Sequence, residues 1–164
     1  MTSSSPFAPI RRVVVGHNSI GLAAKVRDDY LPLNPSPAGL NIRQIWASDE
    51  YPACVSSEDD KATLNMGLNP IGSSFNIVDI PPRSTGIMHR SITLDYGVVI
   101  EGSVVLILDD GSRTVLGPGD AVIVQAGMHR WDNESDQWAR KLGILLPAKA
   151  PVVNGKELQE DVSF

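Results

Sequence analysis

The chain has little helical periodicity and many short β-branched runs, each closed by turn residues. Runs of this kind at short, regular intervals are typical of an all-β sandwich or barrel. Residues 109–112 indicate a tight hairpin, because glycine tolerates the positive φ that such a turn requires, and residues 116–120 indicate a second turn. We predict strands at 12–15, 42–47, 75–80, 97–101, 104–108, 114–116, 121–125, 129–131 and 140–146.

A length of 164 residues predicts one domain with a buried core of its own. We assign residues 75–146 to the core of a barrel and residues 1–74 to an N-terminal extension whose strands pack on that barrel. Residues 147–164 form a loosely held C-terminal tail. The polar, irregular stretch at 48–69 is expected to be a surface excursion with one helical turn.

Charge and composition exclude several classes of partner. The formal net charge is −5 and no stretch is rich in Lys or Arg, so neither a nucleic acid nor an anionic membrane is expected to bind. The longest apolar run, residues 104–108, is too short to span a bilayer, and residues 1–6 lack the features of a secretory signal. A single cysteine, Cys54, excludes an internal disulfide and suits a reducing compartment. We therefore expect a cytoplasmic protein.

The histidines stand out for their scarcity and their setting. Only three occur, and two of them lie in a repeated tripeptide, Met-His-Arg, at 88–90 and at 128–130. Each copy adjoins a predicted strand, and strands far apart in sequence can be neighbours in a barrel. Because imidazole suits both metal binding and proton transfer near neutral pH, His89 and His129 on neighbouring strands would form a site. The third, His17, is expected at the surface in a turn.

Two segments around these histidines resemble the motifs of the cupin superfamily. His89, Asp95 and Gly102 have the spacing of the first motif, which reads glycine, His-x-His, an acidic residue and, after six more residues, glycine. Residues 119–133 resemble the second motif, in which a Gly-Asp turn leads through a strand to His129 and then to Asn133. The resemblance covers residues 75–146. It implies a single-domain jelly-roll β-barrel of a subgroup found in bacteria and in fungal secondary-metabolite clusters, often as homodimers.

The ligand set that this resemblance implies is altered here. Ser91 replaces the second histidine of the first motif and Asp95 replaces the usual glutamate, so the set is reduced to His89, Asp95 and His129. Two histidines and a carboxylate can hold non-haem Fe(II) with open positions, or zinc with one position left for water. We predict these three residues as both metal ligands and catalytic groups, with Fe, Zn or Mn as the metal and no nucleotide cofactor. The alternative is a metal-free pocket in which a His–Asp pair acts as general acid and base.

Alternation along strands suggests which residues would touch a substrate. Alternate residues face the same side, so Ser91 should accompany His89, and Trp131 should accompany His129. An indole beside a histidine forms a flat apolar wall suited to an aromatic or polyketide-like ligand. Tyr96 is a candidate proton donor. For Trp131 and Tyr96 the alternative is a packing role.

Arg140 begins a row of one parity on the last long predicted strand. The rest of that row is apolar (Leu142, Ile144 and Leu146) and is expected to be mostly core. At its start, Arg140 is a candidate clamp for a substrate carboxylate, with a strand-end charge as the alternative.

The resulting functional hypothesis is a small-molecule enzyme of secondary metabolism. A metal-assisted, non-redox reaction such as decarboxylation, dehydration, isomerisation or cyclisation is the first reading, because it needs no groups beyond those named. The alternatives are an Fe(II)-dependent oxygenase or oxidoreductase with the same ligands, and a non-catalytic cupin that binds a small ligand.

Overall fold

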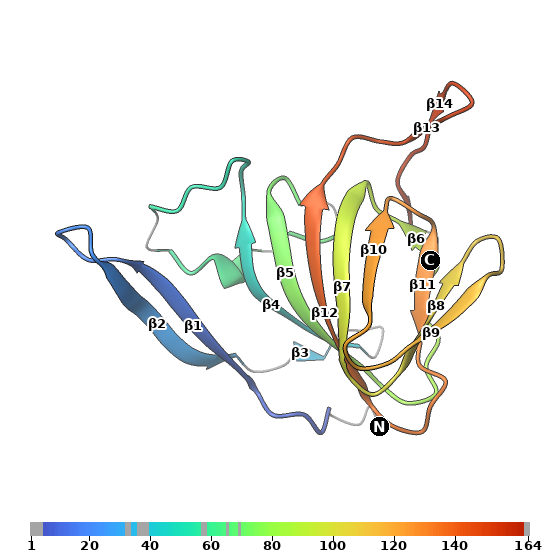
Figure 1. Cartoon of the computed structure of the whole chain (residues 1–164), viewed down its shortest axis with the longest axis horizontal. Helices are drawn as coiled ribbons and strands as arrows, with labels where there is room; N and C mark the ends of the chain where they lie inside the picture. Colours follow the sequence, from blue (N-terminus) through green and yellow to red (C-terminus); the bar gives the residue numbers. More distant parts are fainter. Residues whose placement is uncertain are drawn as a thin grey trace.

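The computed structural model describes residues 5–31, 34–35, 40–56, 59–64, 66–68 and 70–162, and nearly all of its regular structure is β (Figure 1). The larger antiparallel sheet has six strands in the order β10-β7-β12-β5-β4-β3. Its strands are β3 (Asn34–Pro35), β4 (Asn41–Ser48), β5 (Ser73–Ile80), β7 (Thr93–Glu101), β10 (Ala121–Gln125) and β12 (Ala139–Pro147). No helix in the described part of the chain is long and apolar enough to cross a membrane.

The second antiparallel sheet has five strands in the order β15-β6-β11-β8-β9 and curves to face the first (Figure 1). Its strands are β6 (His89–Arg90), β8 (Val104–Leu108), β9 (Arg113–Leu116), β11 (His129–Asp132) and β15 (Asp161–Val162). The predicted all-β class is confirmed. The C-terminal tail is less loose than expected, because after a small hairpin, β13 (Val152–Val153) with β14 (Lys156–Glu157), it pairs β15 with β6.

The packed core lies between the sheets and toward one end of the sandwich. The six-stranded sheet contributes residues from the end of β5, the end of β7 and the start of β12, and the five-stranded sheet contributes residues of β8 and β9. Together these are Ile80, Val99, Ala139, Val104, Leu106 and Leu116. The core packs this part of the sandwich, and a cavity adjoins it, with Ile80 common to both.

The two turns predicted from the sequence, at 109–112 and 116–120, are present. Gly111 has a φ of 84° and its N–H donates to the Leu108 carbonyl, closing the hairpin between β8 and β9. Gly119 has a φ of 90° in the turn that leads into β10. The expected helical turn in the 48–69 stretch is η1 (Lys61–Thr63), a single 3-10 turn.

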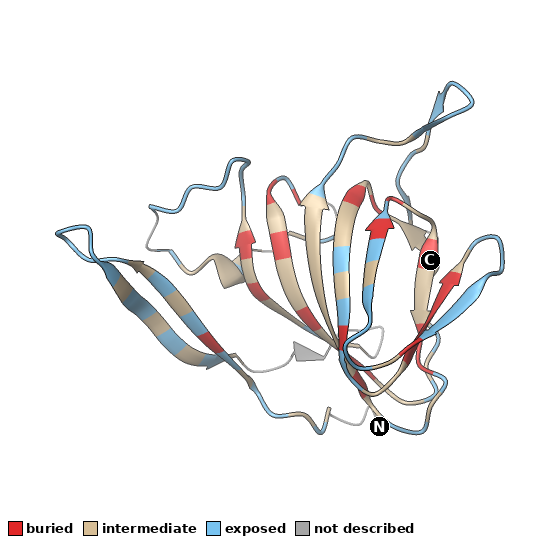
Figure 2. Ribbon diagram, viewed as in Figure 1, coloured by how far each residue is buried: buried red, intermediate tan, exposed pale blue. Residues whose placement is uncertain are grey.

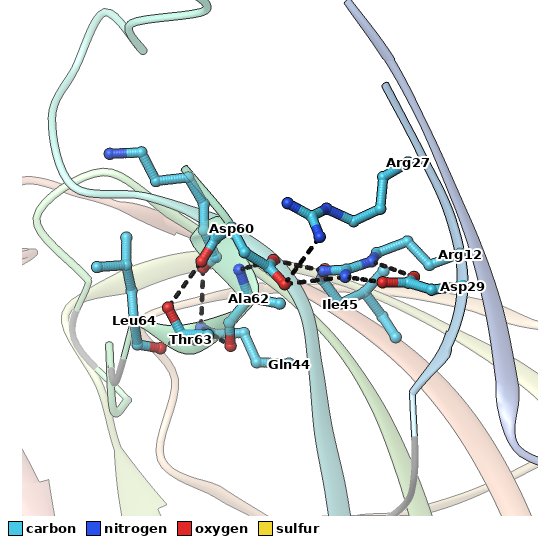
Figure 3. Close-up of polar contacts among 10 residues, drawn as sticks. Arg12, Arg27, Asp29, Gln44, Ile45, Asp60, Ala62, Thr63 and Leu64 are labelled. Carbon is cyan, nitrogen blue, oxygen red and sulfur yellow. Dashed lines mark hydrogen bonds and ion pairs between the residues drawn. The ribbon is translucent and has the colours of Figure 1, made fainter. Parts of the chain in front are cut away.

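The N-terminal strands form a separate ribbon rather than an added layer of the barrel. β1 (Ile10–His17) pairs only with β2 (Ala23–Leu31) among the described residues, and the hairpin projects beside β4 (Figure 1). β2 is not among the strands predicted from the sequence, because charged residues dominate its middle. Figure 3 shows what anchors the ribbon: the Arg12 guanidinium, 4% exposed, lies between the carboxylates of Asp29 and Asp60.

The same close-up shows how a loop is held against the sheet. The Gln44 side-chain amide, on β4, donates to the backbone carbonyls of Lys61, Ala62 and Leu64 (Figure 3). Asp60 caps η1 by accepting from the Ala62 N–H while it also pairs with Arg12. The hairpin, the loop and β4 are therefore linked by one polar network. This network holds the loop where Ala62 and Leu64 line the cavity between the sheets.

Asn133, the last residue of the second motif, links the end of β5 to the loop before β12. Its amide donates to the carbonyls of Ile80 and Gln137, and its carbonyl accepts from the Ser135 N–H and hydroxyl. The side chain is completely buried. Loss of these bonds would leave several buried backbone groups without partners.

We therefore expect Asn133→Ala to lower the free energy of unfolding by about 3 kcal/mol, since unpaired buried polar groups are costly. Urea denaturation followed by fluorescence measures this change. Gln137→Ala, in the same loop but with an exposed side chain, should change the stability by less than about 0.5 kcal/mol. Equal effects of the two substitutions would contradict the role assigned to Asn133.

Candidate functional site

A cavity of about 570 Å³ adjoins the packed core, and the core residue Ile80 forms part of its wall. Its wall is mainly apolar, and a small number of ionisable side chains converge on it. This combination is characteristic of small-molecule sites. The apolar lining includes Leu40, Ile42, Leu64, Leu68, Val78, Ile87, Trp131, Leu145 and Val162, and the ionisable lining includes His89, Asp95, His129 and Lys141.

The two histidines of the repeated tripeptide are brought together by strand pairing. β6 pairs with β11 so that His89 lies directly opposite His129, and the centroids of the two rings are 4.6 Å apart. The Nδ1 of His89 lies 2.9 Å from the Ile87 carbonyl oxygen, and the Nδ1 of His129 lies 2.9 Å from that of Gly127. The repeated sequence thus gives a repeated geometry, in which each ring is fixed by the carbonyl two residues before it.

This geometry sets the tautomer of both rings. A backbone carbonyl only accepts, so Nδ1 carries the hydrogen in the neutral ring and Nε2 keeps its lone pair. Burial lowers the pKa of His129 to about 4, so this residue is neutral near pH 7. Its Nε2 is therefore available as a proton acceptor or as a metal ligand.

Three further predicted residues share the cavity wall. Asp95 and Ser91 line it from the chain around the start of β7, and Trp131 lines it from β11. The Trp131 ring meets the His129 ring edge to face, with centroids 5.9 Å apart. Ser91 is 2% exposed and accepts a hydrogen bond from the Thr93 hydroxyl at 3.0 Å. Ser91 and Trp131 thus lie on the same cavity wall as the histidines, and their contact with a substrate stays a prediction.

Asp95 is an unusual carboxylate. Its Oδ1 is buried without a hydrogen-bond partner. Burial raises its pKa, while a hydrogen bond from Thr93 and the charges of Lys141 and His89 act in the opposite direction. An acceptor held in this way is ready to receive a donor from a bound ligand.

Tyr96 and Arg140 do not reach the cavity. Tyr96 follows the inward-facing Asp95, so it points to the other side of β7 and is 41% exposed. The Arg140 guanidinium pairs with fully buried Asp79, with 2.6 Å between Nε and Oδ1, and lies over the Phe7 ring. The substrate-binding roles expected from the sequence therefore have no support for these two residues, because both face away from the pocket.

Lys141 lines the cavity although it is not among the residues predicted from the sequence, which favoured the row of Arg140 as the inward side of β12. The residues of β12 that line the cavity are Lys141, Gly143 and Leu145. The available signal was the pair Arg140-Lys141 within an apolar strand, since neighbours face opposite sides and one cation must point inward. The Lys141 Nζ lies 4.0 Å from the centre of the Trp131 ring. Burial lowers its pKa to about 8, although the Asp95 carboxylate opposes this shift.

The donor set fits two positions of a metal centre. Metal-binding histidines usually donate their other ring N–H to a carbonyl or carboxylate, and both rings here do so. The described residues contain no group of three His, Cys, Asp or Glu side chains close enough to hold a metal ion, so Asp95 does not complete the expected set of three. His89 and His129 would hold the metal, and solvent or substrate would fill the remaining positions.

Comparisons with known proteins identify the family. The family model "Cupin domain" matches residues 76–144. The cupin-domain-containing oxidoreductase srdB of Neurospora crassa is 40% identical, with 93% of this chain and 81% of that protein aligned. The phomopsin biosynthesis cluster protein C' of Diaporthe leptostromiformis is 30% identical, over 90% of this chain and 83% of that protein. The chain belongs to the cupin family, as its two motifs indicated, and its relatives include proteins of fungal secondary-metabolite clusters.

A solved structure agrees with the fold. The polyketide cyclase RemF of Streptomyces resistomycificus superposes with a TM-score of 0.50 at 17% identity, over 76% of this chain and 71% of that one. At this identity the similarity concerns the barrel alone.

The lowered pKa of His129 predicts a loss of stability in acid. The folded chain keeps this ring neutral down to about pH 4, whereas the unfolded chain protonates it near pH 6.5. The unfolded state thus binds more protons in this interval, and the free energy of unfolding falls as the pH drops from 6.5 toward 4.

Denaturant titrations of chelator-treated protein at pH ~7 and pH ~4.5 measure this effect. His129→Phe should lose less stability than the wild type between the two conditions, by about 2 kcal/mol. His17→Phe, at an exposed position, should behave like the wild type. Identical losses in the His129→Phe and wild-type proteins would show that His129 is not held neutral.

Proposed function

We propose that this protein is a cupin oxidoreductase of secondary metabolism that acts on a small, largely apolar molecule inside the barrel. One observation carries the proposal: two anchored imidazoles, His89 and His129, face a mainly apolar cavity of about 570 Å³. Relatives aligned over most of this chain include a named oxidoreductase and a protein of a biosynthetic cluster. These names support both the reaction class and the metabolic setting.

For the reaction class, we prefer an oxidation to the non-redox reaction that the sequence favoured. The sequence left a non-redox and a redox route open and slightly favoured the non-redox one. The oxidoreductase relatives favour the redox route. The barrel that the chain shares with a polyketide cyclase supports only the fold, so it adds no argument for cyclisation.

The cavity's own residues assign the steps that precede or accompany oxidation. In the metal-free pocket, neutral His129 can accept a proton from the substrate at Nε2, and His89 lies close enough to share the task; a bound metal would use these same lone pairs instead. The Trp131 ring supplies a flat apolar surface next to them. A divalent metal held by the two histidines would supply Lewis-acid activation of an oxygen and, as iron, redox chemistry with dioxygen.

Replacement of His129 by Ala should abolish the reaction and leave the barrel folded, because removing a positioned base costs at least about 100-fold in rate. In the producing organism, the His129→Ala allele should accumulate the same precursor as a deletion of the gene, as measured by mass spectrometry. His17→Ala is the matched control and should give normal product. A normal product level from the His129→Ala allele would show that the site is elsewhere.

Elemental analysis of the purified protein provides a second readout of the same site. Iron, manganese or zinc bound at a constant ratio to the chain should be lost in His89→Ala and retained in His17→Ala. Metal that persists in His89→Ala would remove the histidine pair as the holding groups.

We also propose that the protein is a homodimer, joined through the outer face of the six-stranded sheet. Exposed apolar side chains lie side by side on two adjacent strands: Tyr96, Val98 and Ile100 on β7, and Ile123 opposite Tyr96 on β10. Figure 2 shows exposed bands along both strands. The solvent face of an antiparallel sheet is normally polar, and an extended apolar patch usually marks an interface. A two-fold interface needs only this one patch, because it meets itself in the second copy.

Light scattering should give twice the mass of one chain, and Ile123→Glu should give the mass of a single chain, because a charge cannot be buried without a partner. Val115→Glu introduces the same charge at another exposed strand position, on β9 of the other sheet, and should stay dimeric. A monomeric wild-type protein, or a dimeric Ile123→Glu, would refute this interface.

A further inference from the structure

Lys141 differs from the other cations held against the barrel. Arg12 pairs with Asp29 and Asp60, and Arg140 pairs through two nitrogens with Asp79. Each of these guanidinium groups has carboxylate oxygens within 3.0 Å of its nitrogens. They are structural charges whose donors are used within the fold.

The Lys141 ammonium has no such acceptor. No hydrogen bond and no ion pair to its Nζ occurs among the residues that the structure describes, and its near contact is the Trp131 ring at 4.0 Å. The Asp95 carboxylate acts on it only at longer range. An ammonium has three N–H donors, and Lys141 is a half-buried side chain that lines the cavity. The fold thus retains an unsatisfied cation on the wall of an apolar cavity.

The neighbours of Lys141 indicate what it faces. Trp131 contacts Lys141 with the face of its ring and His129 with an edge-to-face geometry. The ammonium and the His129 imidazole therefore contact the same indole. A ligand with an anionic oxygen on Lys141 would place a neighbouring part of its skeleton against the Trp131 ring and before the Nε2 atoms.

We propose that Lys141 is the anion-binding group of the pocket and that the substrate is a mid-sized apolar molecule with one acidic oxygen, either a carboxylate or an ionised enol or phenol. The assignment rests on the proposed function only in taking this cavity as the substrate site. The amine remains charged near neutral pH, because its pKa of about 8 lies above 7. Apolar walls favour the rest of the ligand, and the Lys141 ammonium fixes its orientation.

The proposal is tested by equilibrium binding rather than by turnover, so its outcome is separate from that of the proposed reaction. Isothermal titration compares three ligands of similar size: 2-naphthoate, its neutral isostere 2-naphthamide, and 4-hydroxycoumarin as an acidic enol. The wild type should bind at least one of the two acids about tenfold more tightly than the amide, because charge-assisted bonds are stronger than neutral ones. The acid that binds more tightly identifies the source of the oxygen.

Variants assign the preference to one residue. Lys141→Met keeps the side-chain length and the contact with Trp131 but removes the charge, so the preference should disappear while 2-naphthamide binds as before. Lys141→Arg should retain a preference for the acid. Arg43→Met removes the other basic side chain that lines the cavity and should leave the preference intact.

Thermal denaturation confirms that each variant is folded, and Lys141→Met should melt no lower than the wild type, since it removes a half-buried charge without a direct partner. Three results would overturn the proposal: the two acids bind no more tightly than the amide, the preference survives in Lys141→Met, or it is lost in Arg43→Met instead. His129→Ala should keep the preference even though it lacks turnover, which distinguishes a failure of catalysis from a failure of recognition.

Discussion

The pairing of β6 with β11 is the contact on which the candidate site depends. It sets His89 opposite His129 and brings together two rings that lie forty residues apart in the chain. β6 has only two residues and lies between β11 and the C-terminal β15, where Val162 pairs with His89. The tail therefore helps to hold the histidine pair. Because each ring is also fixed by a carbonyl of its own chain segment, the Nε2 atoms are oriented before any ligand arrives, which lowers the cost of reaching a reactive geometry.

The charged side chains outside the barrel and those inside the cavity have different roles. Outside the barrel, Arg140 with Asp79 and Arg12 with its two aspartates connect segments distant in sequence, and their donors and acceptors satisfy one another. Inside, Asp95 and Lys141 share one cavity without direct contact. Burial raises the pKa of Asp95 and lowers the pKa of Lys141, so it favours the neutral form of each. A site that keeps polar atoms unsatisfied loses stability but gains affinity for a ligand that satisfies them.

The departures from the family motif change which polar side chains line the pocket. At the position of the second histidine, Ser91 is buried and its oxygen is used by Thr93. Asp95 lies within the field of Lys141, a cation that would repel a metal placed between them. His89 and His129 remain in the geometry of metal ligands. Ser91 and Asp95, at the other two ligand positions of the motif, are polar residues of the cavity wall. This arrangement is compatible with the oxidoreductase relatives, since two fixed imidazoles leave several metal positions to oxygen and substrate.

The sequence by itself determined the class of fold, the strands of the barrel, the two turns and the histidine pair, because β-branched runs, glycine turns and a repeated tripeptide are local signals. It also placed Ser91 and Trp131, since alternation along a strand follows from backbone geometry alone. It missed β2, whose charged strand is stabilised by ion pairs with β1. It also favoured the wrong face of β12, because the row that faces away from the cavity, Leu142, Ile144 and Leu146, is the more apolar of the two. Only the tertiary structure decided that Arg140 points outward to Asp79 and Lys141 inward to the cavity, since that choice depends on which side the opposite sheet covers.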